Sequence, residues 1–173
     1  AGNSLYIAGF DAGGSGGRWR IERRLLSTGA LVTSFGTNGV TLSDPSTGPD
    51  DISEGALAVG AQMFWVAGRT DTPGNWSWRL EKRGLATGVL DSSFGTAGVV
   101  TSDPSTGNDQ AKALLLDGPD LYLAGVDSVL SDVRWRIEKR TVTDGALDVT
   151  FGSAGVVTVN PSSGFDDALA LAV

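Results

Sequence analysis

The sequence RWRIERR at residues 18–24 recurs twice in the chain, as SWRLEKR at residues 77–83 and as RWRIEKR at residues 134–140. Within each copy apolar residues alternate with charged ones, which is the pattern of a β-strand with one apolar and one polar face. Trp and Ile or Leu lie on the first face, and an Arg-Glu-Arg row lies on the second. Because three copies occur at near-constant spacing, we interpret the chain as a tandem repeat.

The repeat extends over the whole chain of 173 residues. Trp78 follows Trp19 by 59 residues and Trp135 follows Trp78 by 57, and the other repeated residues keep these steps. They include Ala8-Gly9, Ala67-Gly68 and Ala124-Gly125, then Phe35-Gly36, Phe94-Gly95 and Phe151-Gly152. We therefore expect a single repeat domain over 1–173, with repeats at about 1–59, 60–116 and 117–173.

Each repeat is expected to form four short strands, because turn residues separate four β-prone segments. The segments are, first, residues 56–59, 111–116 and 168–173; second, 5–9, 63–68 and 121–125; third, the Trp strands; and fourth, 39–42, 98–101 and 155–158. No stretch has a sustained helical period, so an all-β fold is predicted. Three tandem four-stranded antiparallel units of about 58 residues are typical of β-propeller blades. A β-solenoid is the alternative, although its rungs are shorter and more uniform.

One segment of each repeat carries a resemblance to a known family. Residues 88–100 read GVLDSSFGTAGVV, with copies at 29–41 and 145–157, and an apolar strand ending in Ala-Gly occurs at 121–125. These elements resemble the bacterial delta-60 repeat, and the likeness covers all three units. The resemblance implies propeller-like repeats of large secreted or surface-attached bacterial proteins, with no common enzymatic activity. It therefore implies an extracellular or cell-surface location.

Composition and charge exclude several classes of function. Thirteen basic and twenty acidic residues give a net charge of −7, which argues against nucleic-acid or anionic-membrane partners. No apolar run approaches the roughly 20 residues of a membrane span. The chain has neither cysteine nor histidine, so Ser-His and Cys-His catalysis and the usual zinc ligand sets are excluded.

The glutamates indicate a protein that is not an enzyme. Glu22, Glu81 and Glu138 are repeat-equivalent, and each lies between two arginines of an Arg-Glu-Arg row. These rows are interpreted as cross-strand and inter-blade ion pairs, with anion binding as the alternative. Glu54 alone breaks the repeat. One unpaired carboxylate does not make the acid/base pair of a glycosidase, so glycosidase activity is a distant alternative.

Acidic loops at one rim of the repeats suggest calcium as a possible ligand. Calcium prefers oxygen ligands, and such oxygens come from Asp44, Asp50, Asp51, Asp103, Asp109, Asp166 and Asp167. Their spacing matches no EF-hand. Asp-Pro-Ser-x-Gly is also ordinary turn chemistry, in which side chains bond nearby backbone. We therefore expect no bound cofactor and keep calcium as the weaker reading.

Residues 75–77 form a variable feature, Asn-Trp-Ser, before the second Trp strand. Asn75 lies in the N-glycosylation sequon of this feature and is the candidate acceptor. Trp76 is not repeated, and exposed aromatic side chains stack on sugars. Trp76 is thus the candidate glycan contact of a carbohydrate-binding β-propeller, the main alternative function. Trp65 is also unrepeated, but it occupies a strand position that predicts core packing.

The two chain termini complement each other and predict self-assembly. Residues 168–173 read as the first strand of a repeat, and residues 5–9 read as the second strand of one. One blade is therefore expected to be split between the termini, and three blades are fewer than a closed propeller has. We expect completion by a neighbouring copy, as a closed ring or a filament, or by continuation in a longer repeat protein.

Trp19, Trp78 and Trp135 are each expected to be buried between sheets. The leading function is a non-enzymatic extracellular structural or interaction module.

Overall fold

A computed structural model describes residues 2–13, 17–44, 46, 52–72, 74–129 and 132–173, and for residues 52–55 it describes the backbone alone. The described residues form strands and turns, with no helix among them. Nor does this part of the chain contain a helix suited to crossing a membrane. The strands are β1 (Ser4–Asp11), β2 (Arg18–Leu25), β3 (Val40–Ser43), β4 (Ile52–Val59), β5 (Met63–Thr72), β6 (Asn75–Gly84), β7 (Val99–Ser102), β8 (Gln110–Asp117), β9 (Asp120–Val129), β10 (Asp132–Thr141) and β11 (Val156–Val159).

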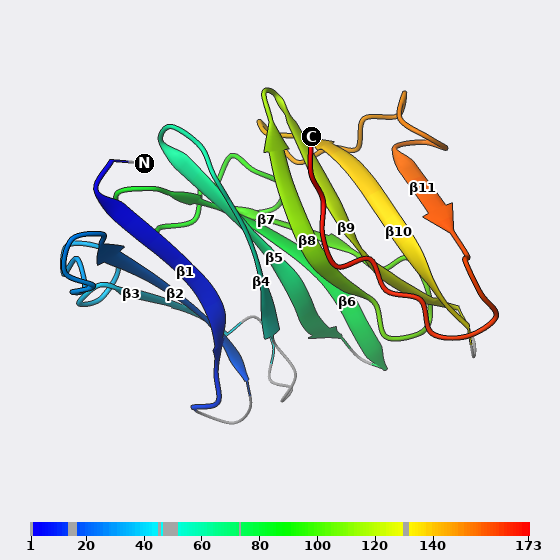
Figure 1. Ribbon diagram of the computed structural model, residues 1–173, viewed down its shortest axis with the longest axis horizontal. Coiled ribbons are helices and arrows are strands. Elements are labelled where there is room, and N and C mark those ends of the chain that lie inside the picture. Colours follow the sequence, from blue (N-terminus) through cyan, green and yellow to red (C-terminus); the bar gives the residue numbers. More distant parts are fainter. Residues whose placement is uncertain (1, 14–16, 45, 47–51, 73, 130–131) are drawn as a thin grey trace.

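These strands form three antiparallel sheets that follow the chain, as Figure 1 shows. Sheet 1 has the order β1-β2-β3, sheet 2 has β4-β5-β6-β7, and sheet 3 has β8-β9-β10-β11. Within each sheet, consecutive strands are hydrogen-bonded antiparallel neighbours, because each connection returns the chain beside the strand it has just left. The predicted all-β class and antiparallel pairing are therefore confirmed. The sheets lie in an open row, with β1 and β11 toward its opposite ends (Figure 1).

The register of the strands follows the repeat. Phe10 pairs with Trp19, Arg69 with Trp78, and Val126 with Trp135. Trp65 therefore occupies the position of Tyr6 and Tyr122. Its side chain is buried, which confirms the expected core placement.

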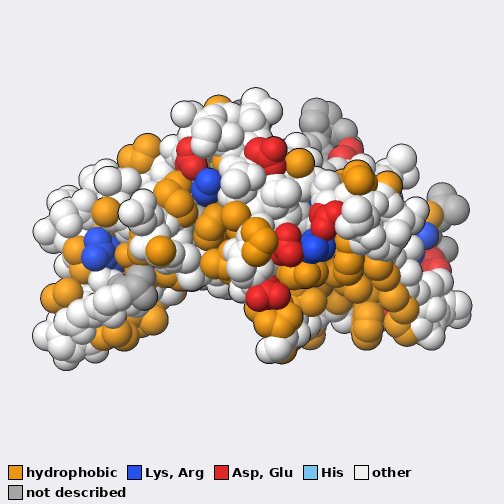
Figure 2. Space-filling model, turned by 90° about the horizontal axis from the view of Figure 1, so that it is seen from above, with side chains coloured by type: hydrophobic (Ala, Val, Ile, Leu, Met, Phe, Trp, Pro, Cys, Tyr) orange, Lys and Arg blue, Asp and Glu red, His pale blue; other side chains and the backbone are white. Residues whose placement is uncertain are grey.

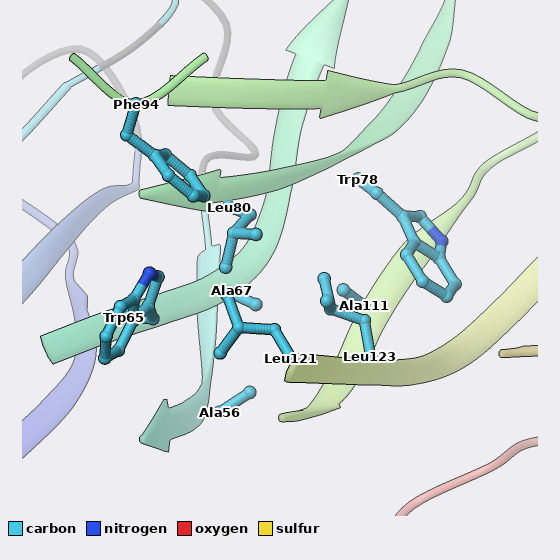
Figure 3. Close-up of a cluster of buried hydrophobic side chains, with 9 residues drawn as sticks. All are labelled: Ala56, Trp65, Ala67, Trp78, Leu80, Phe94, Ala111, Leu121 and Leu123. Atoms are coloured by element: carbon cyan, nitrogen blue, oxygen red, sulfur yellow. The ribbon is translucent and has the colours of Figure 1, made fainter. Parts of the chain in front are cut away.

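The core lies between the sheets rather than within any one of them. One cluster joins sheets 1 and 2 and contains Tyr6, Trp19, Ile21, Phe35, Phe64, Val66 and Leu85. The other cluster joins sheets 2 and 3 and is drawn in Figure 3. There Trp78, Leu80 and Phe94 of sheet 2 meet Leu121 and Leu123 of sheet 3. The apolar faces of the first two Trp strands, β2 and β6, are thus buried by the next sheet along the chain.

Two expectations about the end of the chain are wrong for the chain as it folds here. Trp135 is 36% exposed, whereas Trp19 and Trp78 are 0% and 1% exposed. The reason is that sheet 3 has no described sheet beyond it to cover this side chain. Residues 168–173, expected to form a strand, belong to none. Their counterparts in β4 and β8 pair with β5 and β9, and no equivalent strand lies beside residues 168–173.

Candidate interaction surfaces at the ends of the sheet row

The two internal junctions between sheets share a tryptophan contact. The indole Nε1 of Trp19 donates to the carbonyl of Arg69 at 3.1 Å, and that of Trp78 donates to the carbonyl of Val126 at 2.8 Å. The guanidinium of Arg79 lies 5.8 Å from the Trp19 ring, and that of Arg136 lies 6.0 Å from the Trp78 ring. Each tryptophan is therefore held by a polar contact as well as by burial.

A phenylalanine and a glycine form the second contact of each junction. The amide of Gly36 donates to the carbonyl of Thr87 at 3.0 Å, and the amide of Gly95 donates to that of Asp144 at 2.9 Å. The preceding ring, Phe35 or Phe94, is fully buried. It packs so closely on the glycine of the next sheet that a Cβ on Gly88 would lie 2.9 Å from Phe35 Cζ. Gly145 has the same relation to Phe94, with 2.7 Å to Cζ.

The Arg-Glu-Arg rows form the third contact, in a way that the sequence interpretation missed. Each glutamate binds the two arginines of its own strand, as in Arg79 and Arg83 on Glu81, at 2.8 and 2.7 Å. These arginine–glutamate pairs therefore lie within one strand, although Arg20 of the first row also reaches Asp11 of the neighbouring strand β1 at 3.4 Å. The link between sheets is a serine: Ser43 Oγ donates to Glu81 Oε1 at 2.7 Å, and Ser102 Oγ lies 3.3 Å from Glu138 Oε2. A serine at the end of the fourth strand was the signal that could have revealed this contact.

The arginines also fix the turns that form the junctions. Arg83 Nη1 donates to the carbonyl of Gly88 and Arg140 Nη1 to that of Gly145. Burial acts to raise the pKa of Glu22, but hydrogen bonds from Arg24 and Arg20 outweigh it and the pKa is lowered. In all three rows the carboxylate oxygens of the glutamate are therefore bound by the arginines on either side of it.

At the first end of the row, the groups that receive these contacts are uncovered. We call this the leading face and define it by Leu5, Ile7, Phe10 and Gly29. Leu5 and Ile7 are 46% and 42% exposed, whereas their counterparts in sheet 2, Phe64 and Val66, are fully buried. Gly29 has the same left-handed φ as Gly88 and Gly145, yet nothing lies within 4 Å of the position of its Cβ.

At the other end, the groups that make the contacts are exposed, as at Trp135, or half-buried. We call this the trailing face and define it by Tyr122, Trp135, Ile137 and Phe151, the counterparts of buried residues in sheets 1 and 2. The Trp135 indole has no hydrogen-bond partner among the described residues. Figure 2 shows hydrophobic side chains gathered toward this end of the molecule. The two faces thus carry the two unmatched halves of one junction.

The calcium candidates are used locally where the structure describes them. Asp109 is buried and accepts hydrogen bonds from the amides of Ser105 and Ser128, at 3.0 and 2.7 Å. Burial raises its pKa in spite of these bonds. Asp166 accepts a hydrogen bond from the Ser162 amide, and Asp103 accepts one from the Asn75 side chain. Asp167 forms an ion pair with Lys112, and Asp44 is exposed. Asp50 and Asp51 lie outside the described residues. Among the described residues, no three carboxylates lie close enough together to bind one metal ion.

The sugar-related candidates, Asn75 and Trp76, are also engaged. The Asn75 Nδ2 donates to Asp103 at 2.8 Å and to the carbonyl of Ser105 at 3.0 Å. The guanidinium of Arg69 lies 3.5 Å from the centre of the Trp76 ring and covers one of its faces. The side chain of Glu54 lies outside the described residues. In the described part of the chain, Asn75 is thus bound to the Asp103 loop, and one face of Trp76 is covered by Arg69.

Comparisons with known proteins add no assignment. No protein-family model matches the chain, and no curated protein matches it significantly. The resemblance to the delta-60 repeat therefore stays a prediction that rests on the repeated sequence pattern.

Proposed function

We propose that this chain is a non-enzymatic structural or interaction module that self-assembles through its sheets, which act as β-propeller-type blades. The setting is extracellular or the cell surface, as the delta-60 resemblance implies. The assembly is a ring of two copies with six blades, a filament, or a row continued in a longer repeat protein.

One observation carries the proposal: the tryptophan contact and the phenylalanine–glycine contact of the two internal junctions are each present at the ends of the row as two separated halves. The Trp135 indole has no carbonyl acceptor within the described residues, and the carbonyl of Phe10 occupies the position of the Arg69 and Val126 acceptors. In the part of the chain that the structure describes, no glycine packs on Phe151, and Gly29 has free space where Phe35 and Phe94 pack on its counterparts. Apolar faces of this kind favour association, since burial removes them from water.

The junction between copies differs from the internal junctions in one respect. Val159 occupies the position of Ser43 and Ser102, because it pairs with Trp135 as they pair with Trp19 and Trp78. A valine cannot donate to Glu22 of the next copy. The contact between copies therefore lacks one charge-assisted hydrogen bond and is weaker than a contact inside the chain.

Light scattering and sedimentation velocity over a range of concentrations test the proposal. We expect the chain to associate at micromolar concentration. Ile7→Asp places a charge on the leading face and should return the chain to a monomer. The control, Val89→Asp, places the same charge on an exposed valine of the middle sheet and should leave assembly unchanged. A well-folded wild-type monomer at all concentrations would overturn the proposal.

A further inference from the structure

The inner edge of sheet 1 is an unfilled strand position. β5 and β9 each pair with a strand on both sides, whereas β1 pairs with β2 alone. The inner strands β4 and β8 occupy the corresponding place in sheets 2 and 3. The backbone groups along this edge of β1 have no strand partner among the described residues, and such an edge is a template for another strand.

Gly9 of β1 lies where the other sheets need a glycine beside their inner strand. In β9, a Cβ on Gly125 would lie 2.0 Å from the carbonyl oxygen of Gln110, because the inner strand approaches the backbone so closely there. Gly9 is the equivalent residue of β1, and nothing lies within 4 Å of its Cβ position. Glycine weakens a strand unless a backbone must come close to it. The absence of a side chain at Gly9 is therefore explained by an inner strand that lies beside β1.

The chain holds a segment of the right sequence for that position. Residues 168–173 read ALALAV and correspond to residues 111–116 of β8. The loop before them is already folded as the loop before β8 is. Asp166 donates its amide to the carbonyl of Val133 at 2.9 Å, as Asp109 donates to that of Trp76, and Ser162 caps Asp166 as Ser105 caps Asp109.

We infer that residues 168–173 of one copy form the missing inner strand of sheet 1 in a second copy, antiparallel to β1. The inference rests on the proposed function. The register follows from the internal sheets, where Ala56 and Ala113 pair with Ala67 and Ala124. It places Ala170 opposite Ala8, Leu171 opposite Ile7, and Val173 opposite Leu5.

The side chains fit this position. Ala56, Ala58 and Ala113 of the inner strands are buried, where sheets 2 and 3 approach one another. Residues 170 and 172 are also alanines. Leu169 and Val173 are 68% and 88% exposed in the single chain, and insertion would remove them from water. We therefore assign the strand beside β1 to a second copy of this chain. Residues 168–173 of that copy have the composition, the register and the preformed loop that this position needs.

Cysteine cross-linking tests the register, because the chain contains no cysteine of its own. Chains that carry Ala8→Cys are mixed with chains that carry Ala170→Cys, and disulfide-linked heterodimers are measured under mild oxidation. Directly opposed residues fall within disulfide distance, so this pair should link about tenfold faster than the off-register pair Ala8→Cys with Leu171→Cys. Equal rates for the two pairs would overturn the inference.

Gly9→Val provides a second test in the full chain. The side chain has free space in the single chain, so folding should be unchanged, but it would collide with an inserted strand. We expect the apparent Kd of assembly to rise about tenfold or more. If Gly9→Val assembles like the wild type, strand insertion is wrong while self-assembly through the faces stands. If the wild type never associates, both proposals fail.

Discussion

Sheets 2 and 3 carry almost the same Trp strand, and yet the two strands have opposite surroundings. Trp78 is 1% exposed and its indole donates to Val126, whereas Trp135 is 36% exposed without a partner among the described residues. The sequences SWRLEKR and RWRIEKR do not explain this difference. What differs is the presence of a following sheet. In a repeat protein of this kind, burial belongs to the junction and not to the repeat itself.

The largest expected effect comes from the tryptophans of this comparison. Trp78→Ala should lower the free energy of unfolding by about 3–5 kcal/mol, because it leaves a cavity in the core between sheets 2 and 3. Trp135→Ala should cost the dilute chain far less, since this side chain already contacts water. Urea denaturation at nanomolar concentration measures both. A Trp78→Ala chain that unfolds like the wild type would contradict the placement of this residue between sheets.

The glutamates extend the comparison between a covered and an uncovered sheet to a charged side chain. Glu81 is 0% exposed and contacts Arg79, Arg83 and Ser43. Glu22 is 13% exposed, and no described serine contacts it. Glu81→Ala leaves two arginines unpaired in a buried place and should cost about 3 kcal/mol. Glu22→Ala should cost about 1 kcal/mol, because water still reaches its partners. Equal losses of stability for the two variants in thermal denaturation would mean that the junction does not strengthen the contacts of Glu81.

The paired glycines isolate the effect of the neighbouring sheet. Gly29 and Gly88 have φ angles of 71° and 73°, so alanine is equally strained at both. Only at Gly88 would the new methyl group collide with Phe35 and with Thr41 Oγ1, at 2.3 Å. Gly88→Ala should therefore cost about 1–3 kcal/mol more than Gly29→Ala in the dilute chain. Gly29→Ala should instead weaken assembly, measured by sedimentation.

Much of the architecture could be predicted from the sequence, because period and repeat are local signals. The alternation in RWRIERR predicts a strand wherever it occurs, and the constant steps predict equivalent sheets. The exposure of Trp135 could not be predicted from its repeat, since that exposure depends on a neighbour that the local pattern does not describe. The same reason applies to residues 168–173, whose strand pattern has no partner strand beside it.

The contacts of the candidate site residues could not be predicted from the sequence, because side-chain geometry decides them. Aspartates spaced for a rim of oxygens turn out, as at Asp109, to accept hydrogen bonds from their own loop. Trp76 has the composition of a sugar contact, but Arg69 stacks on its ring. The serine at the end of the fourth strand signals a contact at Ser43, but the sequence does not specify Glu81 as its distant partner.

The smallest expected effect concerns pH and the turn before each junction phenylalanine. In sheet 3, Lys139 Nζ lies 2.8 Å from Asp148 Oδ2, and its hydrogen bond, with that of Thr150, lowers the pKa of Asp148 to about 2. Asp91 in sheet 2 has a pKa lowered to about 2 by hydrogen bonds from Ser93 and Lys82. Sheet 1 has Val32 at this position and no carboxylate to titrate.

Because the folded-state pKa is below the unfolded value near 4, these carboxylates stabilise the fold above that value. Their contribution is lost as pH falls from about 4 towards 2. Asp148→Asn should flatten the dependence of the melting temperature on pH in this window, and Asp91→Asn with Asp148→Asn should flatten it further. Salt should reduce the effect, since both pairs are solvent-accessible. An unchanged pH profile in the double variant would show that these turns resemble the one at Val32, where no ion pair contributes.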